Sequence, residues 1–390
     1  MRRPECSIRQ AGSDLLTTEF EAIMKAVLRL LSAVVLISSG IALAPGTPAS
    51  AAVAPGSVLS SSSAALPPQL GARATGRRVQ YVSTNADGIT ITATGLVLTP
   101  KTGKQNRVVV WAHGTTGLAD RCAPSTNQNV FWPEAQDAVE ELLKRGWTVA
   151  APDYPGLGTP QAHPYLVGNS EGRSIIDSVR AARNLDPALS TQYAIDGHSQ
   201  GGQGALFASQ LAPSYDGNLV LRGTASIAPV SNVDMLAPII PGTPGQGYLV
   251  MGLYGLAAVE PTFNPNTVLA PPARAKSAVL TTGCLNEILA AYQNLTAEQL
   301  LIGGALPAPV VAKLARNDNP AQTSPSAPML VVQGTDDAAV PAFVTDYLVA
   351  EQLEPYAPPV EYVTVPGGTH DSAVTDTTVL VADWIAARFV

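Results

Sequence analysis

The stretch of sequence that decides the fold reads Gly197-His198-Ser199-Gln200-Gly201-Gly202. It follows a short apolar, strand-like run at 193–196 and opens a helical pattern that begins near Gly201. Glycines two residues before and two residues after the serine allow a sharp strand-to-helix turn, which exposes the hydroxyl at the carboxyl end of a sheet. The same turn places amide N–H groups at the helix N-terminus. We therefore interpret Ser199 as a nucleophile rather than as a structural turn serine.

Strand-like runs and helical patterns alternate on both sides of this turn. Strands are predicted at 80–84, 89–98, 108–112, 147–151, 193–196, 223–227, 329–333 and 360–365, the first two paired around Asp87-Gly88. Helices are predicted at 134–145, 171–184, 201–211, 341–351 and 372–388. Short apolar strands that alternate with helices predict the α/β class, with a mostly parallel sheet that helices cover on both faces.

The alternation stops between residues 232 and 326. A charge-free run at 235–259 has three prolines in its first half, which disfavours a transmembrane helix. Because a structureless loop of this size is anomalous in a compact domain, we predict an inserted, mainly helical cap at 232–326. Residues 71–231 and 327–390 then form the core. The segment 52–70, rich in Ala, Ser and Pro, is predicted to be a flexible leader.

A serine nucleophile needs a base, and the order of residues along the chain identifies it. His113 and His163 precede Ser199, and His198 lies inside the turn itself. In the α/β-hydrolase order of nucleophile, acid and histidine, only His370 remains. It lies in a glycine-rich loop after the last predicted strand, where the backbone can bring the imidazole to the serine. A histidine without function on a surface loop is the alternative.

The acid and the oxyanion donors are expected at the ends of other strands. The seventh predicted strand runs into Asp336 and Asp337, and one of this pair should hold His370 in the correct tautomer. One oxyanion donor is expected to be the backbone N–H of Gln200, directly after the nucleophile. The second is expected to be the backbone N–H of Thr115, in the loop after the third predicted strand.

Charge and motif content exclude other chemistries. The 390 residues carry 23 Lys and Arg against 30 Asp and Glu, a formal net charge of −7, and no basic cluster of the kind that nucleic-acid phosphates require. The sequence has no HExxH, no two-cysteine zinc pattern, no Walker loop and no GxGxxG after a strand. We therefore predict no metal, no cofactor and no nucleic-acid partner.

The N-terminal region has the features of a secretory signal. From Met24, two basic residues precede a charge-free stretch at 30–43, and Ala49-Ser50-Ala51 forms a small-x-small cleavage site. We predict that residues 1–51 are a signal peptide region with translation starting at Met24, and that the protein is secreted. An uncleaved membrane anchor is the alternative.

Removal of the predicted signal peptide would also change the number of cysteines in the exported protein. Cys6 would leave with the signal, so that Cys122 and Cys284 remain. An even count in an oxidising compartment favours one disulfide, and two buried thiols are the alternative.

Four parts of the chain carry a resemblance to a known family. They are the turn at 197–202, the run from His113-Gly114-Thr115-Thr116-Gly117 to Cys122, the run Asp153-Tyr154-Pro155-Gly156-Leu157-Gly158, and the long insertion. Together they resemble the secretory lipase family, α/β-hydrolases akin to fungal lipase A. The resemblance spans roughly residues 79–390. Relatives nearest to fungal lipase A have a side-chain carboxylate at the oxyanion loop, where this chain has Gly-Thr-Thr.

The resemblance implies an activity and roles for individual residues. It implies a secreted carboxylic ester hydrolase in which Ser199, Asp337 and His370 match the family's triad and Cys122 pairs with Cys284.

The apolar cap favours lipophilic acyl esters as substrates, acylglycerols among them, with Leu253 or Leu256 in the acyl-binding wall. The alternative is that these two leucines only form the core of the cap. The cap is also expected to make transient contact with a lipid interface. An acyltransferase or a polyester hydrolase would use the same triad. A serine peptidase and a non-catalytic member of the fold are further alternatives.

Overall fold

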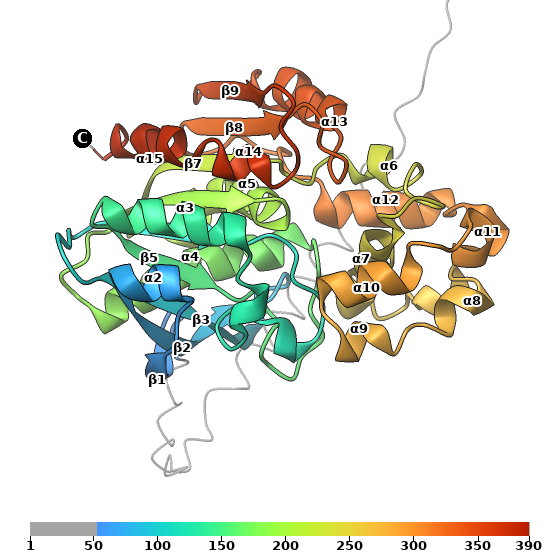
Figure 1. Cartoon of the computed structure of the whole chain (residues 1–390), viewed down its shortest axis with the longest axis horizontal. Helices are drawn as coiled ribbons and strands as arrows, with labels where there is room; N and C mark the ends of the chain where they lie inside the picture. The colour runs from blue at the N-terminus through green and yellow to red at the C-terminus, as the bar shows by residue number, and fades with distance from the viewer. Residues whose placement is uncertain (1–52, 390) are drawn as a thin grey trace, which may run out of the picture. The chain divides into compact units, whose positions relative to one another are not determined.

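Nine strands form one sheet in residues 53–389, the part of the chain that the computed structural model describes (Figure 1). The order across the sheet is β1-β2-β3-β5-β4-β6-β7-β8-β9. In this order, the neighbouring strands β5, β4, β6, β7, β8 and β9 are parallel to one another. β3 pairs antiparallel with β5, and β2 and β1 extend the sheet with further antiparallel pairs. The strands are β1 (Val58–Ala64), β2 (Ala74–Thr84), β3 (Thr90–Pro100), β4 (Val108–Ala112), β5 (Thr148–Pro152), β6 (Gln192–His198), β7 (Val220–Ile227), β8 (Met329–Gly334) and β9 (Val360–Val365). The predicted signal region, 1–51, lies outside the described residues.

Helices cover both faces of this sheet, as the α/β prediction requires. Val109 and Trp111 of β4 point into the core under α2, α3, α14 and α15, whereas Val108 and Val110 point into the core under α4 and α5. The helices of the core are α2 (Pro68–Arg73), α3 (Pro133–Lys144), α4 (Gly168–Leu185), α5 (Gln200–Tyr215), α13 (Ala342–Tyr347) with the π-helix Leu348–Leu353, α14 (Ser372–Thr375) and α15 (Thr378–Ala386). The predicted mostly parallel sheet with two covered faces is confirmed.

The segment predicted to be a flexible leader is ordered instead. Its serine-rich part forms the edge strand β1, which pairs with β2 from Val58 opposite Tyr81 to Ala64 opposite Gly76. Leu70 of α2 is fully buried in the core. An edge strand gains its stability from backbone hydrogen bonds to one neighbour, so it needs no apolar alternation that a sequence would reveal.

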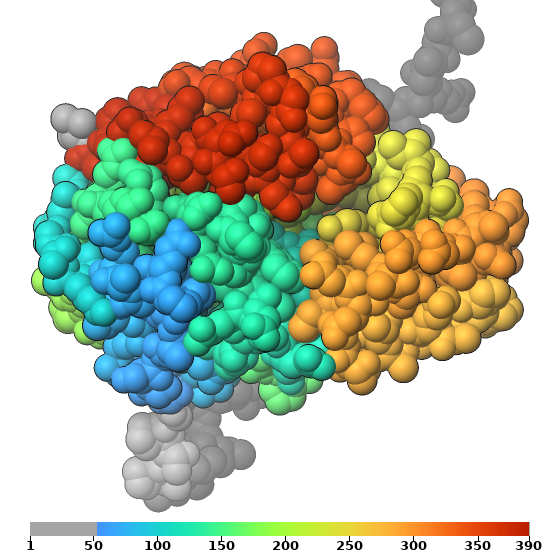
Figure 2. Space-filling model, viewed as in Figure 1, coloured from blue at the N-terminus to red at the C-terminus, as the bar shows by residue number. Residues whose placement is uncertain are grey.

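The insertion is helical, as predicted. It contains α6 (Val233–Leu236), α7 (Gln246–Val259), α8 (Pro271–Arg274), α9 (Val279–Thr282), α10 (Leu285–Tyr292), α11 (Ala297–Leu300) and α12 (Ala308–Asp318). These helices share a hydrophobic cluster of their own that includes Leu253 and Leu256. In Figure 2 the insertion, yellow to orange, meets the teal and red parts of the core along a continuous border. Within the described residues, no helix combines the length and apolarity needed to span a membrane.

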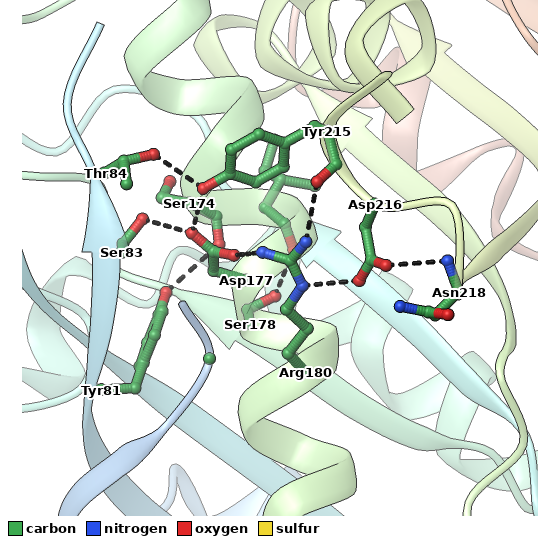
Figure 3. Close-up of polar contacts among 12 residues, drawn as sticks. Tyr81, Ser83, Thr84, Ser174, Asp177, Ser178, Arg180, Tyr215, Asp216 and Asn218 are labelled. Atoms are coloured by element: carbon green, nitrogen blue, oxygen red, sulfur yellow. Dashed lines mark hydrogen bonds and ion pairs between the residues drawn. The ribbon is translucent and has the colours of Figure 1, made fainter. Parts of the chain in front are cut away.

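A buried ionic network joins α4 to β2 and to the end of α5 (Figure 3). The fully buried Asp177 carboxylate accepts hydrogen bonds from Ser83 Oγ and Tyr215 OH, both at 2.7 Å, and pairs with Arg180. Arg180 also pairs with Asp216 at 2.6 Å. These bonds offset the cost of burying the charges. The network therefore fixes α4 and α5, the two helices that support the Ser199 turn.

Candidate active site

Ser199 lies between β6 and α5 in a backbone conformation that is rare outside glycine. Its φ is 58° and its ψ is −116°, a geometry that persists only where the surroundings enforce it. The Ser199 amide donates a hydrogen bond to the Ile227 carbonyl at 2.9 Å. A Cβ on Gly197 would lie 2.3 Å from the Gly201 carbonyl oxygen, and one on Gly201 would lie 1.9 Å from the Ala112 carbonyl oxygen. Close backbone approach therefore requires both glycines of the turn.

The loop after β9 brings His370 to Asp337, which follows β8. His370 Nδ1 lies 2.7 Å from Asp337 Oδ2. The other carboxylate oxygen, Oδ1, accepts hydrogen bonds from the backbone amides of Ala339 and Val340, both at 2.8 Å. Gln333 Nε2 also donates to Oδ2, at 3.0 Å. Four donors thus fix the orientation of this carboxylate.

The environment of Asp337 favours its ionised form. Burial by itself raises the pKa of Asp337, but the hydrogen bond and charge of His370 and the two backbone amides leave that pKa below the ordinary carboxyl value. The ionised carboxylate accepts the Nδ1 proton of His370. Asp336, by contrast, is exposed, and its backbone amide donates to the Gly368 carbonyl at 2.9 Å. Of the predicted pair, Asp337 is the residue that contacts the imidazole.

Ser199 and His370 line the same cavity of about 280 Å³, together with Gly114 and Thr115. In the described part of the chain, the imidazole of His370 has its hydrogen bond to Asp337 and none to Ser199. Hydrogen bonds between a nucleophile and its base are often long in the absence of substrate and shorten in the complex. The structure therefore brings the three predicted triad residues to one site.

His198 supports this site, although its sequence position suggested no role beyond the turn. Its Nε2 lies 3.1 Å from the His370 carbonyl oxygen, and the two imidazole centroids are 4.6 Å apart. Burial, and then the charge of His370, lower the pKa of His198 to about 3. The neutral ring therefore donates its Nε2 proton to the His370 carbonyl and holds the backbone of the histidine loop.

One predicted oxyanion donor directly follows Ser199 in the chain, and the other lines the same cavity. Gln200 is the first residue of α5, so its amide is one of the helix N-terminal N–H groups that have no intrahelical partner. Thr115 is buried and shares the 280 Å³ cavity with Ser199. The Thr115 hydroxyl lies 2.8 Å from Tyr165 OH, and its carbonyl accepts from Trp132 Nε1 at 3.2 Å. These contacts fix the loop that carries the Thr115 amide.

A buried carboxyl that sequence reasoning missed lies behind Gln200. Gln200 Nε2 donates to Glu171 Oε1 at 2.7 Å and lies 3.2 Å from His163 Nε2. The Leu166 amide donates to the same carboxyl oxygen at 3.0 Å. Burial raises the pKa of Glu171 to about 8, despite the lowering effect of these donors. Only the tertiary structure joins residues so far apart in the sequence.

A disulfide links Cys122 to Cys284, with 5.5 Å between the Cα atoms. It ties the loop after β4 to the start of α10 in the cap, where the Leu285 amide also donates to the Thr116 carbonyl at 2.8 Å. The expected pairing is confirmed, and the alternative of two buried thiols is wrong.

A second, larger cavity of about 440 Å³ opens onto Ser199. Apolar side chains of the cap form most of its wall, including Val233, Leu236 and Leu249. Leu253 and Leu256, which were expected in this wall, are instead buried in the cap core. Helix α7 is apolar on all sides, so its sequence could not reveal which side faces the cavity.

One group of side chains in the described residues could hold a metal ion. Ligand atoms of Glu134, His198 and Asp371 all lie within 4.8 Å of one another. Glu134 and His198 are buried and Asp371 is exposed. His198 is already engaged by the His370 carbonyl, and burial raises the pKa of Glu134 to about 7. These three residues are not members of the triad, although they line the same cavity and His198 contacts His370.

Comparisons with known proteins find a matching family model and several similar proteins. A family model described as "Secretory lipase" matches residues 134–390. The chain is 32% identical over 185 residues to secreted triacylglycerol lipase LIP7 of Malassezia globosa, a match that covers 45% of this chain and 39% of the relative. It is 25% identical over 284 residues to LIP4 of the same organism, covering 68% of this chain and 60% of the relative. These matches therefore span less than two thirds of either relative.

Solved structures share the fold. Candida antarctica lipase A in its closed state has a TM-score of 0.74 at 20% identity, covering 86% of this chain and 83% of that chain. The rice cell wall degrading esterase LipA of Xanthomonas oryzae has a TM-score of 0.68 at 22% identity, covering 85% of this chain and 96% of that chain. At this level of identity the likeness establishes the α/β-hydrolase fold, which confirms the predicted fold class.

Proposed function

The chain belongs to the secretory lipase family, and we propose that it is a secreted serine hydrolase of lipophilic carboxylic esters, acylglycerols among them. One observation carries the proposal. His370 hydrogen-bonds the ionised Asp337 and lines the cavity that also contains Ser199, and Ser199 has the strained backbone conformation of the turn. A serine, an imidazole and an orienting carboxylate in this order are the groups that covalent acyl transfer requires.

Each residue has a role in the proposed reaction. Ser199 Oγ attacks the ester carbonyl carbon while His370 Nε2 accepts the hydroxyl proton. Asp337 stabilises the imidazolium that forms, and the amides of Gln200 and Thr115 donate hydrogen bonds to the developing oxyanion. The imidazolium then protonates the departing alkoxide, which leaves an acyl-enzyme on Ser199. Water attacks this ester with His370 again acting as base, and the free acid leaves.

The two cavities are assigned to the two halves of the ester. His370 must deliver a proton to the leaving alcohol, and it lines the 280 Å³ cavity but not the 440 Å³ cavity. The alcohol therefore occupies the smaller cavity. The acyl chain occupies the larger, mostly apolar one, where its burial contributes roughly 0.8 kcal/mol per methylene.

Contact of the cap with a lipid interface is part of the proposal. Ile239 is 51% exposed and also lines the acyl cavity, and Ile302, elsewhere in the cap, is 55% exposed. Apolar side chains at the cavity mouth can enter a lipid surface at little cost and bring the cavity to the substrate. Secretion is supported by the disulfide, since such bonds persist in oxidising compartments.

Hydrolysis and active-site labelling test the proposal together. Wild-type protein should release p-nitrophenol from butyrate and palmitate esters, release fatty acid from emulsified triglyceride, and react with a fluorophosphonate probe. Ser199→Ala should lose both activities, because no other group can form the covalent intermediate. Ser214→Ala, at the far end of the same helix α5, is the matched control and should keep both. Labelling of Ser199→Ala at the wild-type rate would contradict the nucleophile assignment.

A further inference from the structure

One carboxyl group lies in the wall of the acyl cavity with a free hydrogen-bonding atom. Asp318, the last residue of α12, is the only acidic residue among the described residues that line this cavity. It is 1% exposed, and its Oδ2 has no hydrogen-bond partner in the described part of the chain. Buried polar atoms are nearly always paired, so an unpaired carboxyl oxygen in a substrate cavity requires an explanation.

The position of Asp318 is fixed from several sides. Gln203 Nε2, on α5, donates to the Asp318 carbonyl oxygen. The neighbouring Asn319 accepts from the Val233 amide at 2.7 Å and donates to Asp234 at 2.8 Å, which joins the end of α12 to α6. These contacts fix the backbone of residues 318 and 319 at the end of α12.

Helix α5 and the cavity wall both connect Ser199 with Asp318. Gln203 follows Ser199 by four residues, about 6 Å along α5. Asp318 and Ser199 line the same cavity, so an acyl chain esterified to Ser199 can extend along the wall that contains Asp318.

The chemistry of the carboxyl limits what it can bind. Burial, and then the proximity of Glu171, raise the pKa of Asp318 well above its usual value, which favours the protonated form, a group that both donates and accepts. Water can meet that need while the cavity is free of substrate. A plain alkyl chain displaces water and offers neither donor nor acceptor, whereas an alcohol offers both.

We propose that Asp318 makes this enzyme selective for acyl chains that carry a hydroxyl group, that is, for esters of hydroxy acids. This inference rests on the proposed ester hydrolysis and names the substrate class of the same site. The Asp318 carboxyl hydrogen-bonds the hydroxyl of the chain while the surrounding side chains, among them Val233 and Leu314, pack on its methylenes.

Paired substrates test the selectivity. We would measure kcat/KM for p-nitrophenyl esters of hexanoate and octanoate against ω-hydroxyhexanoate and ω-hydroxyoctanoate. In at least one pair, Asp318→Leu should lower the hydroxyacyl-to-alkyl ratio about tenfold relative to wild type, the effect of one net hydrogen bond. Asp318→Asn should keep most of the ratio, because an amide also donates and accepts. Leu314→Val, one turn earlier on α12, removes volume without changing polarity and should affect both members of a pair alike.

The outcomes separate this inference from the proposed function. Equal ratios in wild type and Asp318→Leu, with alkyl esters still hydrolysed, would overturn the selectivity and leave the hydrolase intact. If Asp318→Leu does not fold, inhibition of the wild-type protein decides instead. Free ω-hydroxyoctanoate should then inhibit more strongly than octanoate, and equal or weaker inhibition would overturn the proposal. Stronger inhibition by ω-aminooctanoate than by ω-hydroxyoctanoate would also overturn it, because a cation pairs with an ionised carboxylate. Absence of hydrolysis of every ester would instead defeat the proposed function.

Discussion

Replacing Asp337 by asparagine tests the acid assignment, and the structure determines how the new amide must lie. Oδ1 of Asp337 accepts two backbone amides, from Ala339 and Val340, at 2.8 Å each. An NH₂ group on that side would face two donors. It must therefore face His370 Nδ1 and Gln333 Nε2, which are at 2.7 and 3.0 Å from Oδ2. His370 Nδ1 then has to accept a hydrogen bond, so the imidazole carries its proton on Nε2.

This tautomer cannot accept the proton of Ser199. We expect Asp337→Asn to reduce turnover by roughly three to four orders of magnitude, which corresponds to about 4 to 5 kcal/mol on the barrier. The cost to folding is smaller. Gln333 Nε2 loses one of its acceptors but keeps the Gly334 and Val340 carbonyls, both at 3.1 Å, so the cost is at most on the order of 1 to 3 kcal/mol. Activity should therefore fall far more than the fraction of folded protein.

The assay compares turnover of p-nitrophenyl butyrate with thermal unfolding for two adjacent variants. Asp336→Asn is the matched control, because the Asp336 side chain is exposed and accepts a hydrogen bond from the hydroxyl of the neighbouring Thr335. It should stay within about threefold of wild type, as expected for an exposed polar position. The reasoning is refuted if Asp336→Asn is inactive while Asp337→Asn turns over near the wild-type rate.

Three further predictions concern stability and specificity. The double variant Cys122→Ala, Cys284→Ala opens a loop with a sequence separation of 162 and should lose on the order of 5 kcal/mol of unfolding free energy; an unchanged urea midpoint would contradict this. Burial raises the pKa of Glu171 from 4.5 to about 8. Between these two pH values the folded protein keeps a proton on Glu171 that the unfolded chain has released, so this group lowers the unfolding free energy as the pH rises from 4.5 to about 8. Glu171→Gln should therefore make the unfolding free energy from urea titrations fall less steeply with pH, by at most about 1.4 kcal/mol per pH unit, and an unchanged slope would count against it. Gly252 lines the acyl cavity and an added Cβ there meets nothing within 4 Å, so Gly252→Leu should reduce palmitate hydrolysis about tenfold or more relative to acetate. Gly217→Leu, equally open but outside the cavity lining, should leave that ratio unchanged.

The strands of the parallel sheet were predictable because each contains a short, mostly apolar run, which is fully buried in β4, β5 and β8 and half-exposed at the edge in β9. The predicted ranges 108–112 and 360–365 coincide with β4 and β9. β1 was missed because a serine-rich edge strand has no apolar alternation. The helix predicted at 372–388 is two helices, α14 and α15, since Thr377 leaves the helical conformation and its hydroxyl bonds the Ala373 carbonyl instead.

The candidate triad could be proposed from the sequence because its parts carry local signals, with the family resemblance favouring Asp337 over Asp336. Ser199 lies between two glycines of a turn, and His370 and Asp337 lie in loops directly after strands. Glu171 and Asp318 carry no such signal. Each lies in a helix, where a carboxylate is ordinarily solvated, and only the packing of α4, α5 and α12 buries them.

There is a physical reason why the sequence indicates the candidate triad but not Glu171 or Asp318. The chemistry of acyl transfer depends on backbone geometry at Ser199, which close contacts between glycines and neighbouring carbonyls enforce. Such geometry requires glycines at fixed positions around the serine, and the sequence shows them. Selection among acyl chains depends on which side chain the cap places in the cavity wall, and a single carboxyl such as Asp318 can decide it. Exchanging that side chain should therefore change the preferred ester while leaving the reaction at Ser199 untouched.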